Sequence, residues 1–364
     1  MPLTPNGKIN RRALYTAKLD SAPETTSEGT VADPLQAQLI RIWEELLGRK
    51  PVGIRDNFFE LGGHSLLAAR LMHRIKQVHG KSLPLAVLLE APTVEQLAAV
   101  LRDGESHRWS SLVPIQPEGS KPPFFCVHGV GGNIVGFREL GKCMKPDYPF
   151  YGLQSQGLNA RYARHTSIEE MASHYLNEIR TVQPTGPYHL GGFSLGGLVA
   201  YEMACQLVSR GEEVSLVVLF DTYASNPTPL KESLLEMLLH PTWAPLQQLP
   251  EEVRRKVRRT YLAWRLPEDL KKVMRTNAQA AEHYRLRPYG GKAILLRADD
   301  TWRASDDPYA RWKELIAELE TVKIPGAHMD ILREPHVSRL AERLKSCIDA
   351  AALDEPKVLA RNAG

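Results

Sequence analysis

The first hundred residues carry apolar side chains at the spacing of amphipathic helices. The apolar positions are Leu35, Leu39, Ile42, Trp43, Leu46 and Leu47, then Leu67, Leu71, Ile75 and Val78, then Leu97, Val100 and Leu101. The boundary signals are Asp33-Pro34 and Gly48 for the first helix, Leu66 and about Val78 for the second, and a Thr93–Gln96 capping box for the third. Residues 33–103 are therefore predicted to form a small helical bundle, with Ser65 at the N-cap of its second helix.

From residue 112 onward, short apolar runs alternate with helical patterns. The predicted strands contain Phe124–Val127, Tyr188–Gly192, Val217–Phe220, Ile294–Leu296 and Val322–Ile324. After the second of these, Leu198, Val199, Tyr201, Met203 and Leu207 mark one helical face. This alternation predicts an α/β domain over residues 112–351. An unusually long, helical and proline-interrupted insertion separates Asp221 from the strand that begins near Ala293.

Ser194 stands between a predicted strand and a predicted helix, in Gly192-Phe193-Ser194-Leu195-Gly196. Glycines on both sides allow a sharp bend that exposes the serine hydroxyl. The positive end of the following helix would lie beneath any oxyanion. The pattern is that of a nucleophile elbow, and it predicts Ser194 as a catalytic nucleophile. The alternative is a glycine-rich turn that only lets strand and helix pack closely.

A nucleophilic serine requires a base, and the base requires an orienting acid. His328 follows a short strand in a loop, which favours it over His336, placed where the closing helix begins. The acid has two candidates at strand ends, Asp221 and the pair Asp299-Asp300. The residues alone leave this choice open.

A tetrahedral intermediate also needs amide donors for its oxyanion. The predicted strand Phe124–Val127 leads into the glycine-rich loop 128–133, so the backbone N–H groups of Val130 and Leu195 are the expected donors. The loop lacks the glycine spacing and the lysine of phosphate-binding motifs. His128, at its start, is expected to be structural.

The segment around Ser65 carries a second signature. Asp56-Asn57-Phe58-Phe59-Glu60-Leu61-Gly62-Gly63-His64-Ser65-Leu66 resembles the attachment motif of peptidyl carrier domains from nonribosomal peptide synthetases. The resemblance implies that Ser65 covalently holds 4′-phosphopantetheine, added by a phosphopantetheinyl transferase that uses coenzyme A. Gly62 and Gly63 are expected to leave room for that arm.

The resemblance extends along the chain. The segment from Pro2 to Arg12 resembles the closing motif of an adenylation domain, so residues 1–20 are expected to be its remnant, within a chain cut from a larger synthetase. Residues 112–351 are similar to the type I thioesterase of such synthetases. In that family the acid follows the earlier strand, which implies Asp221, and residues of about 224–288 form a lid. The expected architecture is a four-helix carrier bundle followed by an α/β hydrolase with a helical lid. Residues 21–32 and 104–111 are expected to be linkers, and 352–364 a tail.

The resemblance implies that an acyl or peptidyl thioester on Ser65 is released through an acyl-Ser194 intermediate, by hydrolysis or macrocyclisation. Adenylation and condensation domains upstream are the implied partners. Two alternatives remain: a stand-alone serine esterase acting on free esters, and an inert hydrolase-fold interaction module.

Composition limits the remaining classes. A net charge of +4 over 364 residues, without clustering on one segment, argues against nucleic-acid binding. The four cysteines show no paired spacing and no metal-ligand pattern, and no signal or membrane-length apolar segment is present. We therefore expect a cytoplasmic enzyme without a metal. The charged run 251–259 in the insertion is interpreted as a solvated helix face or, more specifically, as a dock for the carrier.

Overall fold

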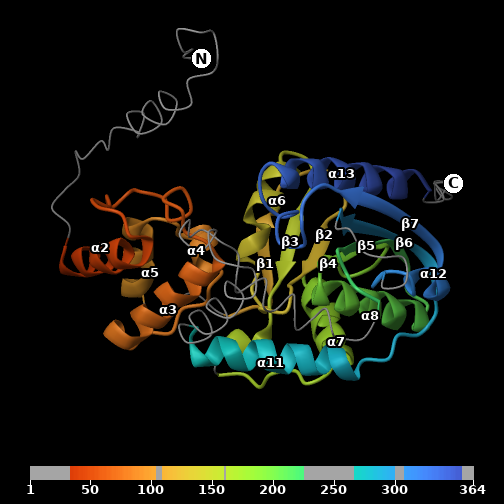
Figure 1. Ribbon diagram of the computed structural model, residues 1–364, viewed down its shortest axis with the longest axis horizontal. Helices are drawn as coiled ribbons and strands as arrows, with labels where there is room; N and C mark the ends of the chain where they lie inside the picture. The colour runs from red at the N-terminus through yellow and green to blue at the C-terminus, as the bar shows by residue number, and fades with distance from the viewer. Residues whose placement is uncertain (1–32, 104–108, 160, 225–265, 300–306, 355–364) are drawn as a thin grey trace, which may run out of the picture.

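The computed structural model describes residues 33–103, 109–159, 161–224, 266–299 and 307–354 (Figure 1). Several predictions concern residues outside this part: the adenylation remnant 1–20, the linker 21–32, most of the linker 104–111, and the tail beyond 354. The greater part of the predicted lid, with the charged run 251–259, and the candidate acid Asp300 also lie outside the described residues.

Residues 33–103 are helical. Their elements are α2 (Pro34–Leu47), α3 (Ser65–His79), α4 (Val87–Glu90) and α5 (Val94–Asp103). Asp33 closes a capping box at the start of α2, and Gly48 ends that helix in the left-handed conformation. The Thr93–Gln96 box forms before α5 as predicted. The fully buried Trp43 packs edge-on against Phe58 at the centre of this domain.

One boundary differs from the prediction by a residue. The N-cap of α3 is His64, which has extended backbone, and Ser65 is the first residue of the helix itself. The serine is therefore held by helical backbone directly at the positive end of α3.

The larger domain is built on one sheet with the strand order β1-β3-β2-β4-β5-β6-β7. The strands are β1 (Leu112–Gln116), β2 (Phe124–Val127), β3 (Phe150–Leu153), β4 (Tyr188–Phe193), β5 (Val214–Phe220), β6 (Tyr289–Ala298) and β7 (Ile316–Ile324). Among the strands that the structure describes, only β1, at one edge, runs antiparallel to its neighbour, and the other pairs are parallel. The central β4 is buried along its whole length, and apart from His189 its residues are apolar or glycine.

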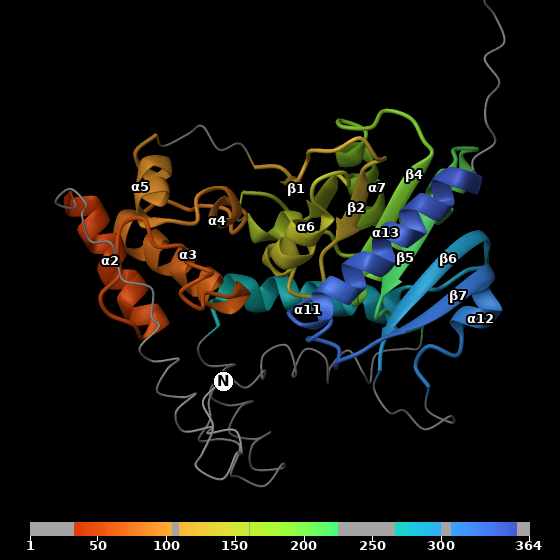
Figure 2. The ribbon, with the colours of Figure 1, turned by 90° about the horizontal axis from the view of Figure 1, so that it is seen from above.

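Helices cover both faces of the sheet (Figure 2). On one face, α7 (Ile168–Ile179) and α8 (Leu195–Ser209) enclose the core that contains Tyr175 and Tyr201. On the other face, α6 (Arg138–Met144) and α13 (His336–Asp354) pack over Phe124 and Phe150. The remaining elements are η1 (Val135–Phe137), η2 (Gln156–Leu158), α11 (Glu268–His283) and α12 (Trp312–Leu315).

The arrangement determines where chemistry can occur. Because β2, β4, β5, β6 and β7 are parallel, the loops that follow them meet at one edge of the sheet. Ser194 follows β4, Asp221 follows β5 and His328 lies in the loop after β7, so the topology brings the three predicted triad residues together.

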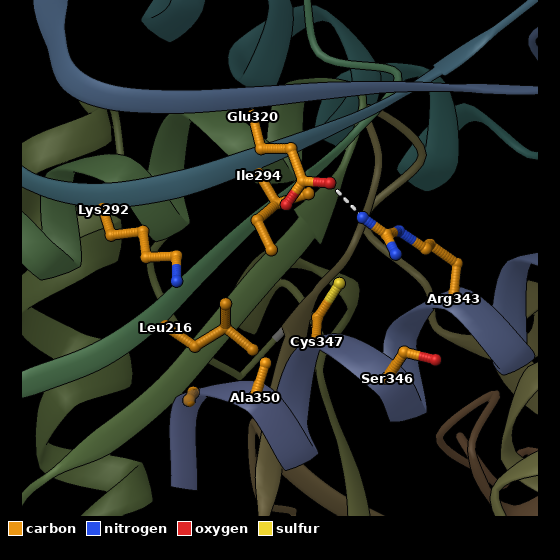
Figure 3. A pocket seen from close by; sticks show the side chains of 9 residues that line it. Leu216, Lys292, Ile294, Glu320, Arg343, Ser346, Cys347 and Ala350 are labelled. Atoms are coloured by element: carbon orange, nitrogen blue, oxygen red, sulfur yellow. Dashed lines mark hydrogen bonds and ion pairs between the residues drawn. The ribbon is translucent and has the colours of Figure 1, made fainter. Parts of the chain in front are cut away.

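A small cavity lies between the sheet and α13, away from this edge. Figure 3 shows its lining, where Glu320 of β7 forms an ion pair with Arg343 of α13. Its volume is about 60 Å³, room for a few water molecules at most. No triad residue lines it, so it is a packing gap and not an acyl site.

Within the described residues, no helix is long and apolar enough to cross a membrane. Over those same ranges, no group of three or more His, Cys, Asp or Glu side chains is placed to hold a metal ion.

Candidate active site and carrier serine

Ser194 occupies a strained turn between β4 and α8. Its φ of 56° and ψ of −120° are unusual for a residue with a side chain. The turn depends on glycine: a Cβ on Gly192 would overlap the Gly196 carbonyl, and one on Gly196 would overlap the Val127 carbonyl. The backbone N–H of Ser194 donates to the Phe220 carbonyl at 2.8 Å, which ties the elbow to β5. These features match the geometry of a nucleophile elbow.

His328 and Asp221 form a buried pair beside this elbow. The Nδ1 atom of His328 lies 2.5 Å from Oδ2 of Asp221, and the two side chains are 2% and 0% exposed. The imidazole stacks on Phe193, the residue before Ser194, with 4.7 Å between ring centroids. Because Nδ1 bonds to the carboxylate, Nε2 is the nitrogen left to accept a proton. The pair thus has the form of the acid–base half of a triad.

The second oxygen of Asp221 is held by two donors from the neighbouring segments. The N–H of Ala298, at the end of β6, donates to Oδ1 at 2.6 Å, and the Tyr309 hydroxyl donates to it at 2.5 Å. Burial and then the charge of Asp221 raise the pKa of Tyr309 well above its usual value of 10, so the hydroxyl stays protonated. Both oxygens of the buried Asp221 carboxylate thus have hydrogen-bond partners.

The alternative acid and base lie elsewhere. Asp299 is about half exposed and forms a surface ion pair with Lys323 at 3.1 Å. His336 begins α13, as the sequence indicated, and packs against Gly326. The structure thus pairs His328 with Asp221 and leaves these two residues outside the pair.

The loop after β2 approaches the elbow from the opposite side. Val130 and Leu195, the predicted oxyanion donors, are 3% and 1% exposed. The loop turns at Gly132, whose φ is +76°. Its carbonyl at Val130 accepts a 2.9 Å hydrogen bond from the side chain of Asn277 on α11. A side chain of α11 therefore holds the loop that carries the predicted Val130 donor.

His128 anchors the base of this loop. Its Nδ1 donates to the Gly129 carbonyl at 2.6 Å, and its Nε2 accepts from the Tyr175 hydroxyl at 2.7 Å. Burial lowers the pKa of His128 from 6.5 to about 4, so the ring is neutral at pH 7. Because the neutral His128 ring has a hydrogen-bond partner at each nitrogen, its role is structural and not catalytic.

Tyr309 and Asn277 were not identified from the sequence. Removing the Tyr309 hydroxyl should loosen the carboxylate that orients His328, so Tyr309→Phe is expected to lower kcat about tenfold, which corresponds to about 1.4 kcal/mol, with KM unchanged. Steady-state kinetics on a free thioester would measure this. Tyr148→Phe is the matched control, because its hydroxyl also bonds to an aspartate, Asp349, at 2.6 Å, but on the α6–α13 face. Equal kcat values for the parent and Tyr309→Phe would contradict the role of Tyr309.

Gly62 and Gly63, which precede Ser65, have roles within the helical domain itself. Gly62 has a φ of +98°, and a Cβ there would meet nothing within 4 Å, so its backbone conformation requires glycine. A Cβ on Gly63 would overlap the Phe58 ring, so close packing requires the second glycine. The structure thus gives Gly62 a backbone role and Gly63 a packing role.

The helical domain contacts the larger domain through a defined set of residues. Leu266, Leu270 and Met274 from the α11 region join the apolar cluster of the helical domain. The guanidinium of Arg138 lies 4.5 Å from the ring centre of Phe59, and Lys76 pairs with Asp269 at 3.5 Å. Figures 1 and 2 both show the end of α11 beside α3. In the described part of the chain, this contact is mainly apolar.

The fold and these residues define an α/β protein of the hydrolase class, preceded by a small helical domain. The thioesterase domain family model matches residues 122–347, and the model of the phosphopantetheine attachment site matches residues 37–101. The chain therefore belongs to the thioesterase domain family, and it carries a phosphopantetheine attachment domain ahead of the thioesterase.

Two curated relatives resemble this chain over different lengths. The chain is 46% identical over 234 residues to a dimodular nonribosomal peptide synthase of Bacillus subtilis (strain 168), covering 64% of this chain and 10% of that protein. It is 38% identical over 349 residues to malpinin synthetase of Mortierella alpina, covering 93% of this chain and 4% of the relative. The chain thus spans a tenth or less of these relatives.

A solved structure covers both domains together. Holo-AB3403, a four-domain nonribosomal peptide synthetase bound to AMP and glycine, matches 95% of this chain and 28% of its own, with a TM-score of 0.58 and 28% identity. These matches confirm the resemblance to the carrier–thioesterase pair of nonribosomal peptide synthetases.

Proposed function

We propose that this chain releases an acyl or peptidyl group from its own carrier domain in nonribosomal peptide synthesis, with Ser194, His328 and Asp221 as the catalytic triad. The observation that carries the proposal is the buried 2.5 Å contact between His328 and Asp221, stacked beside the Ser194 elbow. It stands in the same chain as a phosphopantetheine attachment domain. Residues 33–103 are then the four-helix carrier bundle, and residues 112–351 the α/β hydrolase.

Ser65 fits the attachment of phosphopantetheine. It is the first residue of α3, where free backbone N–H groups and the helix dipole favour a phosphate, and its side chain is partly exposed. The group supplies a terminal thiol on which an acyl chain is held as a thioester. A phosphopantetheinyl transferase with coenzyme A would install it.

The first chemical step forms a bond from the Ser194 Oγ to the thioester carbonyl carbon. His328 accepts the Ser194 proton at Nε2, while Asp221 stabilises the resulting imidazolium through Nδ1. The N–H groups of Val130 and Leu195 would bind the oxyanion, aided by the dipole of α8. When the carbon–sulfur bond breaks, His328 returns the proton to the sulfur, and the acyl group remains as an ester on Ser194.

The second step uses the same residues in reverse. His328 removes a proton from water, or from an amine or hydroxyl of the acyl chain, as that nucleophile attacks the acyl-Ser194 carbonyl. The oxyanion donors act again, and His328 protonates the departing Ser194 oxygen. Water gives a free acid and an internal nucleophile gives a ring.

The partners follow from this role. Adenylation and condensation domains upstream would activate and build the acyl chain on Ser65, and residues 1–20 would belong to the adenylation domain. Cys126, Cys143, Cys205 and Cys347 are all free thiols, which supports a reducing compartment such as the cytoplasm.

Loading of Ser65 tests the carrier half of the proposal. The chain is incubated with a promiscuous phosphopantetheinyl transferase and unacylated coenzyme A, and its intact mass is measured. The parent should gain one phosphopantetheine, and Ser65→Ala should gain none. Ser82→Ala, an exposed serine in the same domain, should load like the parent. Loading of Ser65→Ala would show that the arm is attached elsewhere.

A further inference from the structure

Helix α11 contacts two parts of the molecule that are distant in sequence. Its first turns carry Leu270 and Met274, which are 8% and 5% exposed. Both side chains pack into the apolar cluster of the helical domain. Val273 and Asn277, four residues apart on the same helix, contact the loop after β2. Figures 1 and 2 show α11 running from beside α3 to beneath the sheet.

The contact with the loop is specific. The side-chain amide of Asn277, 2% exposed, donates to the Val130 carbonyl at 2.9 Å. A turn earlier in the helix, Val273 packs against Gly132, where a Cβ would come within 2.8 Å of its methyl group. Gly132 in turn accepts a hydrogen bond from the Ser155 N–H at 2.7 Å. The loop is thus pinned at its apex by one buried polar contact and one apolar contact from α11.

The contact between Asn277 and the Val130 carbonyl affects the orientation of the neighbouring Val130 N–H. The planar peptide group that contains the Val130 carbonyl is attached to the Val130 Cα, so fixing this carbonyl restricts ψ of Val130 and limits how the adjacent peptide group, which carries the Val130 N–H, can turn. The N–H of that residue is the oxyanion donor in the proposed mechanism. A donor stabilises an oxyanion strongly only if it is already aimed at the oxygen before the reaction. Without its partner, the buried carbonyl would also be left unsatisfied, which favours rotation of the loop toward another donor.

We propose that Asn277 is a positioning residue for the oxyanion hole, which holds the Val130 carbonyl so that the Val130 N–H faces the developing negative charge. This inference rests on the proposed function, because it requires Val130 to be an oxyanion donor. It assigns a role in the reaction to a helix that also contacts the carrier, and it separates the two roles by residue: Leu270 and Met274 contact the carrier, whereas Asn277 contacts the loop.

The test uses Asn277→Leu, which keeps the approximate shape of the side chain and removes the donor. On a free acyl-N-acetylcysteamine thioester, kcat should fall about 10- to 100-fold, somewhat less than the loss of a whole oxyanion donor, and KM should stay within about twofold. Asn277→Ala should give a similar loss and serves if the leucine variant folds poorly. Gln279→Leu is the matched control, because it removes an exposed carboxamide from the same helix.

A trifluoromethyl ketone separates positioning from general damage to the fold. Such a ketone reacts with an active serine to give a tetrahedral oxyanion adduct, so its affinity should fall by the same factor as kcat/KM. Thermal unfolding measured in parallel gives the stability of each variant. Loss of kcat with unchanged ketone affinity would overturn the inference, and so would a rise in KM alone.

The acyl group delivered from Ser65 provides a further comparison. Because both substrates form the same oxyanion, Asn277→Leu should slow release of the carrier-bound acyl group by the same factor as release from the free thioester. A loss confined to the carrier-bound substrate would mean that Asn277 acts through docking, and would overturn the inference. A parent chain without activity on either substrate would instead contradict the proposed function.

Discussion

Ser194→Ala is expected to lower kcat for thioester cleavage by about a million-fold, leaving only the contribution of binding and the oxyanion donors. The loss is this large because the triad acts as a unit: without the nucleophile, the His328–Asp221 pair has no proton to accept. Cleavage of a free acyl-N-acetylcysteamine thioester, followed by release of thiol, measures the effect directly.

The variant should fold normally. The Ser194 side chain makes no cap hydrogen bond to α8, and alanine can adopt the same strained backbone at little added cost. Ser209→Ala, at the other end of α8, is the matched control, since its hydroxyl bonds only to the preceding turn at the Gln206 carbonyl. Cleavage by Ser194→Ala within tenfold of the parent would exclude Ser194 as the nucleophile.

Asp221→Asn is expected to lower kcat about ten-thousand-fold. An asparagine can offer an N–H to Nδ1 of His328, which favours the tautomer with hydrogen on Nε2. In that form His328 cannot accept the proton of Ser194. The same substitution also places an uncharged group where Ala298 and Tyr309 donate, so the imidazolium loses its buried counter-charge.

Comparing Asp221→Asn with Asp299→Asn tests which of these two aspartates orients His328. Asp299 lies about half exposed in an ion pair with Lys323, and such surface pairs contribute about 0–1 kcal/mol. The variant should keep parental kcat and nearly parental stability. A large loss in Asp299→Asn, with little loss in Asp221→Asn, would reverse the assignment of the acid.

Local signals in the sequence predicted the helical domain and the elbow well. The caps at Asp33, Gly48 and Thr93 act through neighbours within a few residues, so both ends of α2 and the start of α5 follow from the sequence. The elbow likewise depends on Gly192 and Gly196, which flank Ser194 directly. Residues 316–321 of β7 were missed because this edge strand is largely exposed, and Glu318 and Glu320 interrupt its apolar pattern.

Contacts between distant segments could not be predicted in this way. Asp221 and Asp299 both end strands, and the residues alone gave no reason to prefer one; the resemblance to a known family did. Tyr309 meets Asp221 across 88 positions, and Asn277 meets Val130 across 147. Each looks like an ordinary polar residue in its own segment. The glycines before Ser65 illustrate the same limit, because the need for Gly63 arises from the packing of Phe58.

The measurement that tests the central claim most directly is the intact mass of the chain after loading of Ser65 with an acyl-phosphopantetheine, followed over time in the parent and in Ser194→Ala. The account predicts that the acyl mass disappears from the parent, with the arm retained, and persists on Ser194→Ala. Persistence of the acyl mass on both chains, or its equal loss from both, would contradict transfer from Ser65 to Ser194.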